Sequence, residues 1–185
     1  MRFNLLAGSI ATALLVGMLP AQAAWQSYIN REVGFSFIAP GEVKAEKTAY
    51  KSAVAGERAA TRFQSIEDNI QYRVTVVDFT ARANEGDAFI KEAASAMVDS
   101  KKVLADTDAR VDSSYGRKMT VDLSDNGGRS MSGIYFKEGH LIHLEVTVLP
   151  ANGDYETPDM GRFVDSVAFL EGRAEADATE LKLQK

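Results

Sequence analysis

Apolar and polar residues alternate with a period of two through much of the middle of this chain. The clearest case is residues 69–79, where apolar side chains take one set of alternate positions and polar side chains the other: Ile70, Tyr72, Val74 and Val76 against Gln71, Arg73 and Thr75. Successive side chains of a β-strand point to opposite faces, so this pattern predicts a strand with one buried face. We expect it to be a central strand of a sheet, with Val74 and Val76 in the core.

Three further alternating segments follow one another closely along the chain: residues 115–123, 129–136 and 140–149. The short stretches between them are rich in turn-forming residues: Asp125-Asn126-Gly127-Gly128 and Lys137-Glu138-Gly139. Tight turns between alternating segments predict a three-stranded antiparallel meander. Residues 34–38, and more weakly 58–66, alternate in the same way and predict two earlier strands.

Two helices interrupt the strands. The first is indicated by an apolar stripe at helical spacing: Phe89, Ile90, Ala93, Ala94, Met97 and Val98. We expect Asn84 to cap its start and Lys101 and Lys102 to lie near its end. The second begins with Thr157 as cap and Pro158 in its first position, and it turns its apolar residues inward: Met160, Phe163, Val164 and Val167. The order of strands, helix, meander and helix predicts an α+β fold, an antiparallel β-sheet flanked by helices.

Two short stretches resemble PsbP-like domains, the family named for an extrinsic photosystem II protein. One is Gly34-Phe35-Ser36-Phe37 running into Ala39-Pro40-Gly41, and the other is the sequence RFVDSVAF at residues 162–169. The resemblance implies an α-β-α sandwich around an antiparallel sheet over most of residues 34–169. The chain departs from the family at Val43, where an aromatic residue often follows the early proline. A shared fold does not carry function, and nothing in the sequence marks a photosystem subunit.

The first 23 residues have the parts of a secretory signal peptide. Arg2 gives a positive start, residues 5–19 form an apolar run, and Ala21-Gln22-Ala23 is the pattern that signal peptidases cut after. The run is shorter than the roughly 20 residues that span a bilayer. We expect cleavage after Ala23 and a periplasmic or secreted protein with no stable membrane insertion; an uncleaved anchor is the alternative. No cysteine follows the run, which excludes a lipoprotein anchor.

Removal of residues 1–23 leaves 162 residues, the size of one domain. We expect a single α+β domain over residues 24–170 and a flexible or helical tail over residues 171–185. The chain has no cysteine, so packing must stabilise it without disulfides, and cysteine-based metal or thiol chemistry is excluded. Loss of Arg2 lowers the net charge from −5 to −6, which argues against nucleic acid or an anionic membrane as partner.

The two histidines, His140 and His143, are the obvious candidates for chemistry. Their separation of three residues on a strand places the rings on opposite faces, so they are not expected to share a metal ion. Ser130 and Ser132 lie within a predicted strand, without the strand-to-helix turn that exposes a nucleophilic serine. We therefore expect both histidines to be structural or surface residues.

Carboxylates cluster in three places: Asp106, Asp108 and Asp112; Asp122 and Asp125; and Asp154, Glu156 and Asp159. Calcium needs several oxygens around one point, which the first and third clusters offer. Neither matches a calcium loop, since Arg110 takes the third ligand position of the first cluster. We expect solvated acids, and a calcium site at Asp154, Glu156 and Asp159 remains the alternative.

Trp25 and Tyr28 lie just beyond the expected cleavage point. We expect them to pack in the core or at a sheet edge; the alternative is that they anchor a partner. Tyr72, Tyr115 and Tyr135 fall on predicted strands, where alternation is expected to bury most of them.

No catalytic, cofactor-binding or metal-binding residue emerges from these patterns, and no cofactor is expected. The sequence favours an exported, non-enzymatic binding or accessory protein whose partner is an unknown protein or small molecule. The alternatives are a periplasmic hydrolase that lacks a recognisable motif and a cell-envelope stress or structural factor with no defined ligand.

Overall fold

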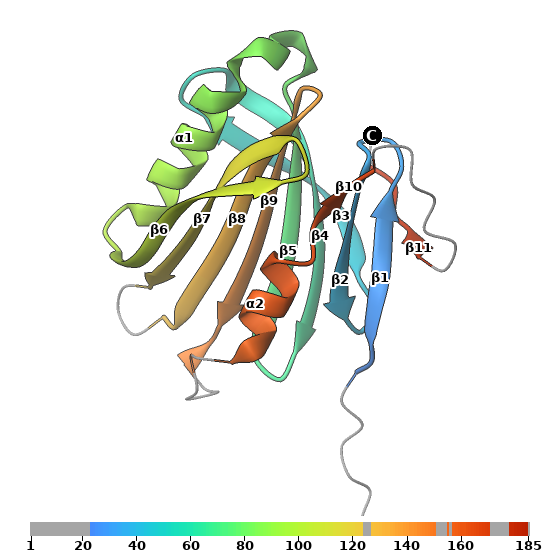
Figure 1. Cartoon of the computed structure of the whole chain (residues 1–185), viewed down its shortest axis with the longest axis vertical. Coiled ribbons are helices and arrows are strands. Elements are labelled where there is room, and N and C mark those ends of the chain that lie inside the picture. Colours follow the sequence, from blue (N-terminus) through green and yellow to red (C-terminus); the bar gives the residue numbers. More distant parts are fainter. Residues whose placement is uncertain (1–22, 124–126, 151–154, 156, 171–177, 185) are drawn as a thin grey trace, which may run out of the picture.

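The structure is a computed structural model that describes residues 23–123, 127–150, 155, 157–170 and 178–184. The predicted signal segment up to residue 22, residues 171–177 of the tail, and Asp125, Asp154 and Glu156 lie outside these ranges. The described residues form two sheets and two α-helices (Figure 1).

The larger sheet is built from seven strands: β3 Lys44–Ser52, β4 Gly56–Glu67, β5 Ile70–Asp78, β6 Lys102–Val111, β7 Ser114–Asp122, β8 Arg129–Lys137 and β9 His140–Val148. They are antiparallel in the order β3-β4-β5-β9-β8-β7-β6. The predicted meander is therefore confirmed as β7-β8-β9. The predicted strand at residues 69–79 is confirmed as β5, inside the sheet, with Val74 and Val76 buried.

The smaller sheet has four strands: β1 Trp25–Asn30, β2 Phe35–Pro40, β10 Ala168–Phe169 and β11 Thr179–Glu180. Its order is β10-β2-β1-β11, and β11 runs parallel to β1. The last described segment thus includes a short strand, β11, and Leu181 is buried directly after it. For these residues, the expectation of a flexible or helical tail is wrong, because pairing with β1 and burial of Leu181 hold the segment.

Helices cover the two faces of the larger sheet unequally (Figure 1). On one face, α1 Gly86–Val98 buries Phe89, Ala93 and Met97 against the sheet. On the other face, α2 Pro158–Val164 shares the core with β2 of the smaller sheet, where Phe163 packs against Phe37. The antiparallel α+β prediction is confirmed, but the fold is a β-rich sandwich with two helices, because a second sheet covers much of one face.

The start of α1 differs from the prediction. Asn84 belongs to a 3₁₀ helix, η1 Thr80–Glu85, and the residue at the N-cap of α1 is Glu85, which makes no side-chain capping hydrogen bond. The start of α2 agrees with the prediction, because the Thr157 hydroxyl accepts a hydrogen bond from the backbone N–H of Asp159 at 3.3 Å and Pro158 follows.

Candidate functional site

Helix α1 covers only part of its face of the larger sheet. It packs against β7, β8 and β9, while the strand register places polar side chains of β3, β4, β5 and β9 on the same face. We call this surface the open face and define it by seven residues: Lys44, Glu46, Arg62, Gln64, Arg73, Thr75 and Glu145. All seven are charged or hydrogen-bonding, and all are at least partly exposed.

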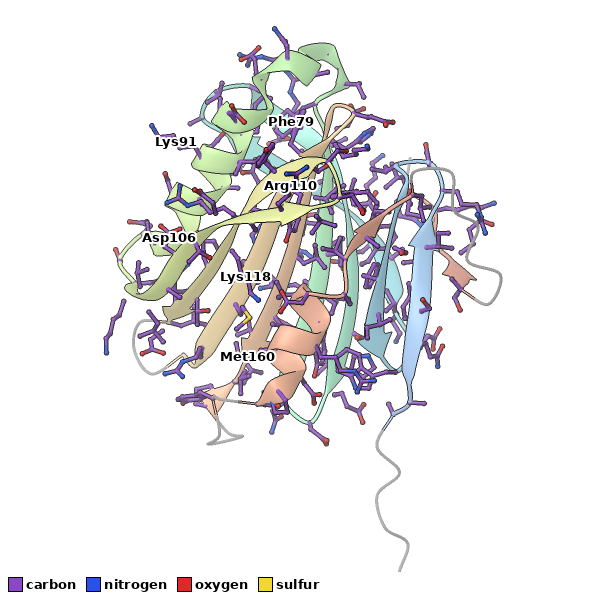
Figure 2. All side chains as sticks on the ribbon, viewed as in Figure 1. Phe79, Lys91, Asp106, Arg110, Lys118 and Met160 are labelled. Carbon is purple, nitrogen blue, oxygen red and sulfur yellow. The ribbon has the colours of Figure 1, made fainter. Side chains whose placement is uncertain are left out.

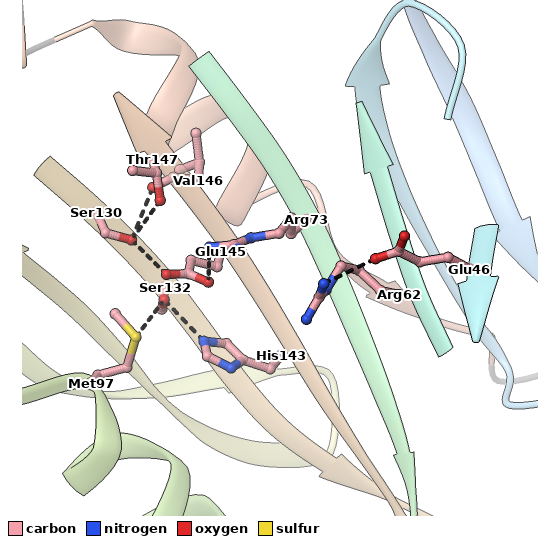
Figure 3. Close-up of polar contacts among 10 residues, drawn as sticks. All are labelled: Glu46, Arg62, Arg73, Met97, Ser130, Ser132, His143, Glu145, Val146 and Thr147. Atoms are coloured by element: carbon pink, nitrogen blue, oxygen red, sulfur yellow. Dashed lines mark hydrogen bonds and ion pairs between the residues drawn. The ribbon is translucent and has the colours of Figure 1, made fainter. Parts of the chain in front are cut away.

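Two ion pairs cross the open face. Arg62 donates to Glu46 at 2.9 Å between β4 and β3, and Arg73 donates to Glu145 at 2.8 Å between β5 and β9 (Figure 3). The second pair is the more buried, with side-chain exposures of 27% for Arg73 and 22% for Glu145. Each arginine has a further terminal nitrogen that makes no hydrogen bond to a described residue.

Where the open face meets β8, two hydroxyl groups hold the Glu145 side chain in place. Ser130 donates to Glu145 at 3.1 Å, and Thr147 donates to Ser130 at 3.2 Å (Figure 3). Both hydroxyl-bearing residues are buried. A carboxylate held by an arginine on one side and a hydroxyl on the other keeps a fixed position.

A serine and a histidine meet beside these two hydroxyl groups. The Ser132 hydroxyl lies 3.0 Å from Nε2 of His143 and donates to the sulfur of Met97 on α1 at 3.5 Å (Figure 3). Ser132 is fully buried between the sheet and the helix. A nucleophile must reach its substrate, so in this arrangement the contact orders the core instead of presenting a reactive hydroxyl.

Burial and charge set the protonation of the neighbouring pair His143 and Glu145. Burial lowers the pKa of His143, and the cations Arg73 and Lys101 lower it further. The carboxylate of Glu145 raises it, but by less than the other causes together lower it. For Glu145, burial acts to raise the pKa, but the pKa is lowered overall: His143 lowers it when the imidazole is protonated, and Arg73, the Ser130 hydroxyl and Lys101 lower it as well. At neutral pH the imidazole is therefore neutral and the carboxylate ionised.

The two histidines lie on opposite faces of β9, as the sequence predicts. His143 faces α1, whereas His140 lines a hollow on the other face together with Thr61, Asp78 and Gln184. The described residues contain no group of three or more histidines and carboxylates placed to hold a metal ion.

Three of the described acids in these clusters have hydrogen-bond partners. Asp106 accepts two hydrogen bonds from Arg117, Asp122 pairs with Arg129, and Asp112 accepts the backbone N–H of Phe169. Asp159 lies in the first turn of α2. Two members of the calcium alternative, Asp154 and Glu156, lie outside the described residues.

The early aromatic residues pack within the sandwich. Trp25 is partly buried at the edge of the core, where the Arg162 guanidinium lies 4.1 Å from its ring and Tyr72 meets it edge-on. Tyr28 is buried, and so are Tyr72 and Tyr135. Tyr115 departs from the expectation, because its ring projects from β7 beside the sheet edge and is 67% exposed.

The sequence patterns place Arg73 on the polar face of its strand but do not identify its partner. Glu145 occupies the corresponding alternate position of residues 140–149, so the signal was present in each strand separately. The pair forms only because β5 and β9 are neighbours, with Arg73 directly opposite Glu145.

No family model and no curated protein matches this chain. Among solved structures, the chain is similar to the solution structure of cyanobacterial PsbP (CyanoP) from Synechocystis sp. PCC 6803. The match has a TM-score of 0.52 and 14% sequence identity, and it covers 88% of this chain and 99% of the other. The fold is therefore PsbP-like, as the sequence resemblance indicates, and at this identity the likeness concerns the fold alone. In the part of the chain that the structure describes, no helix is long and apolar enough to span a membrane.

Proposed function

We propose that this chain is an exported, periplasmic binding or accessory protein without catalytic activity, and that the open face is its binding surface. The observation that carries the proposal is the set of charged side chains on interior strands β4, β5 and β9. These side chains face solvent, whereas the middle strands of a sheet usually carry apolar side chains that are covered by another layer. Arg62 and Arg73 each hold a carboxylate with one nitrogen and keep another for a ligand.

A protein partner suits this surface better than a small molecule. Small-molecule sites are mostly apolar and concave, whereas the open face is a polar sheet surface. At its end, Ile66 is 60% exposed and borders a hollow that Lys44 and Gln64 also line. Protein interfaces combine an apolar anchor with a polar surround, and Ile66 beside Lys44 and Gln64 provides that combination.

The hydrolase alternative has one observation in its favour, the contact between Ser132 and His143. Reaction there would require α1 to move, because Ser132 is fully buried beneath Met97. The binding proposal needs no such movement.

Affinity purification of the tagged protein from the periplasm tests the proposal. The variant Arg62→Glu with Arg73→Glu reverses two charges on the open face, and Lys47→Glu with Lys51→Glu reverses two exposed charges on the other face of β3. We expect the first variant to lose a partner that the wild type and the control retain. Equal recovery by all three proteins would contradict the open face as binding surface. Intact mass of the same sample tests export, because cleavage after Ala23 predicts a chain that begins at Ala24.

A further inference from the structure

Strand β6 forms an exposed edge of the larger sheet. It pairs with β7, and most of its ten residues are exposed. An edge strand presents backbone N–H and C=O groups that can pair with another strand, and proteins often protect such edges with lysines. The opposite edge, β3, has that protection in Lys44, Lys47 and Lys51, whereas β6 carries a single lysine at its start.

Asp108 on this edge makes no hydrogen bond to Arg117, the residue opposite it, although its charge acts on that arginine. Arg117 lies directly opposite Asp108, but it donates hydrogen bonds of 2.6 and 2.8 Å to both oxygens of Asp106. This contact lowers the pKa of Asp106. Among the described residues, Asp108 has no hydrogen-bond partner.

Arg110 is available on the same face, two residues further along β6. Its Nε donates to the backbone oxygen of Asp112 at 2.8 Å, and its guanidinium lies 5.2 Å from the exposed ring of Tyr115. Its terminal nitrogens make no hydrogen bond to described residues. The free edge therefore carries an acid, Asp108, and a base, Arg110, on the same face; both are exposed and both can form further hydrogen bonds. Figure 2 labels Arg110 and, on the same strand, Asp106.

Charge selects one arrangement for two copies of this strand. Two antiparallel strands related by a two-fold axis pair about a central residue that faces its own copy. A centre at Asp106, Thr107 or Asp108 places aspartates opposite each other, and a centre at Arg110 opposes two arginines. A centre at Ala109 instead pairs Asp108 with Arg110 twice, and opposite charges across strands are stabilising. A centre at Ala105 or earlier needs a regular strand through residues 103–105, where the register shifts. A centre at Val111 opposes Arg110 to Asp112, which lies beyond the end of β6, so it leaves almost no ladder.

We propose that β6 pairs antiparallel with β6 of a second copy of this chain, centred on Ala109, with Asp108 of each copy bound to Arg110 of the other. The pairing extends the seven-stranded sheet across the dimer and places Asp108 between Arg117 of its own chain and Arg110 of the other. Asp106 faces Asp112 of the second copy, but Asp112 lies beyond the end of β6 and Arg117 neutralises Asp106, which weakens the repulsion between these two acids. The ladder is short, so the dimer is weak and is best trapped covalently. This inference does not depend on the function of the open face.

The absence of cysteine allows a direct test. Opposed residues of antiparallel strands have Cα atoms about 4.5–5.5 Å apart, which is within the range for a disulfide. Ala109→Cys should therefore give a covalent dimer under mild oxidation. Ala105→Cys is the matched control, because Ala105 has the same size and lies on the same strand and face. In the proposed dimer it is about 26 Å from its copy, at about 3.3 Å per residue.

Non-reducing electrophoresis should show a dimer for Ala109→Cys and monomer for Ala105→Cys. Adding Asp108→Arg to Ala109→Cys should slow cross-linking at least fivefold, and adding Arg110→Asp as well should restore the rate. Cross-linking of Ala105→Cys at the same rate, despite its greater exposure, would overturn the proposal. Sedimentation of the unmodified protein gives an answer that does not depend on the cysteine variants. We expect a mass that rises with concentration and rises less for Asp108→Arg, and a monomer at every concentration would also overturn the proposal.

Discussion

Removing Arg73 should destabilise the protein much more than removing Arg62, although both arginines form one ion pair on the same sheet face. Breaking a buried pair by removing one partner costs about 3–5 kcal/mol, and an exposed pair contributes about 0.2–1 kcal/mol. Side-chain exposure is 27% and 22% for Arg73 and Glu145. It is 34% and 45% for Arg62 and Glu46. The cost of breaking the Arg73–Glu145 pair should therefore lie between these two ranges, and the cost of breaking the Arg62–Glu46 pair should lie within the range for exposed pairs.

We therefore expect Arg73→Met to lower the free energy of unfolding by about 2 kcal/mol and Arg62→Met by about 0.5 kcal/mol. Methionine keeps much of the apolar stem, so the difference reports mainly on the charge left behind. Urea denaturation with a common slope measures both values.

A double variant separates the orphaned carboxylate from other effects. Adding Glu145→Gln to Arg73→Met removes the unpaired charge while leaving an oxygen that can accept from Ser130. It should recover at least half of the lost stability. Equal midpoints for the two single variants, or a double variant less stable than Arg73→Met, would refute the reasoning.

Three further variants test the core, the pH dependence and a turn. Val74→Ala should cost about 2 kcal/mol in urea denaturation because it removes buried methyl groups, and Thr75→Ala on the polar face should cost less than about 0.5 kcal/mol; equal costs would contradict the face assignment. The folded protein lowers the pKa of His143 below its ordinary 6.5, so the unfolded state binds more protons and stability should fall as the pH drops below about 6.5. His143→Gln should flatten the curve of melting temperature against pH there, and an unchanged slope would contradict the burial argument. Gly139 has φ +83°, and an added Cβ would lie 2.7 Å from the Thr80 backbone, so Gly139→Ala should cost about 1–3 kcal/mol. Gly161→Ala, within α2, would place its Cβ 3.8 Å from the Asp165 carboxylate, an ordinary contact distance. It should be neutral or stabilising by up to about 1 kcal/mol, and thermal melts that rank the two glycine variants in reverse would contradict this.

Local patterns predicted the elements that have one buried and one exposed face. Apolar and polar residues alternate along β5 because its even-numbered side chains enter the core. The start of α2 could be predicted from Thr157 and Pro158, which are typical of a helix N-terminus. Strands β3 and β6 escaped prediction because they are the two edges of the sheet, where both faces are largely exposed and no apolar alternation is needed.

The candidate site required knowledge of which strands are neighbours. Arg73 and Glu145 are 72 positions apart, and the polar face of each strand reads as a solvated surface when taken alone. The same limit applies to Ser132 and His143, because their mutual contact depends on the pairing of β8 with β9.

Site-specific photo-crosslinking in the periplasm tests the binding surface most directly. A photoreactive residue at Gln64 lies on the open face, and one at Lys47 lies on the opposite face of neighbouring strand β3. We predict an adduct of defined mass from position 64 that is absent from position 47 and is lost when Arg73→Glu is added. Identical adducts from both positions, or an adduct at position 64 that persists with Arg73→Glu, would contradict the account.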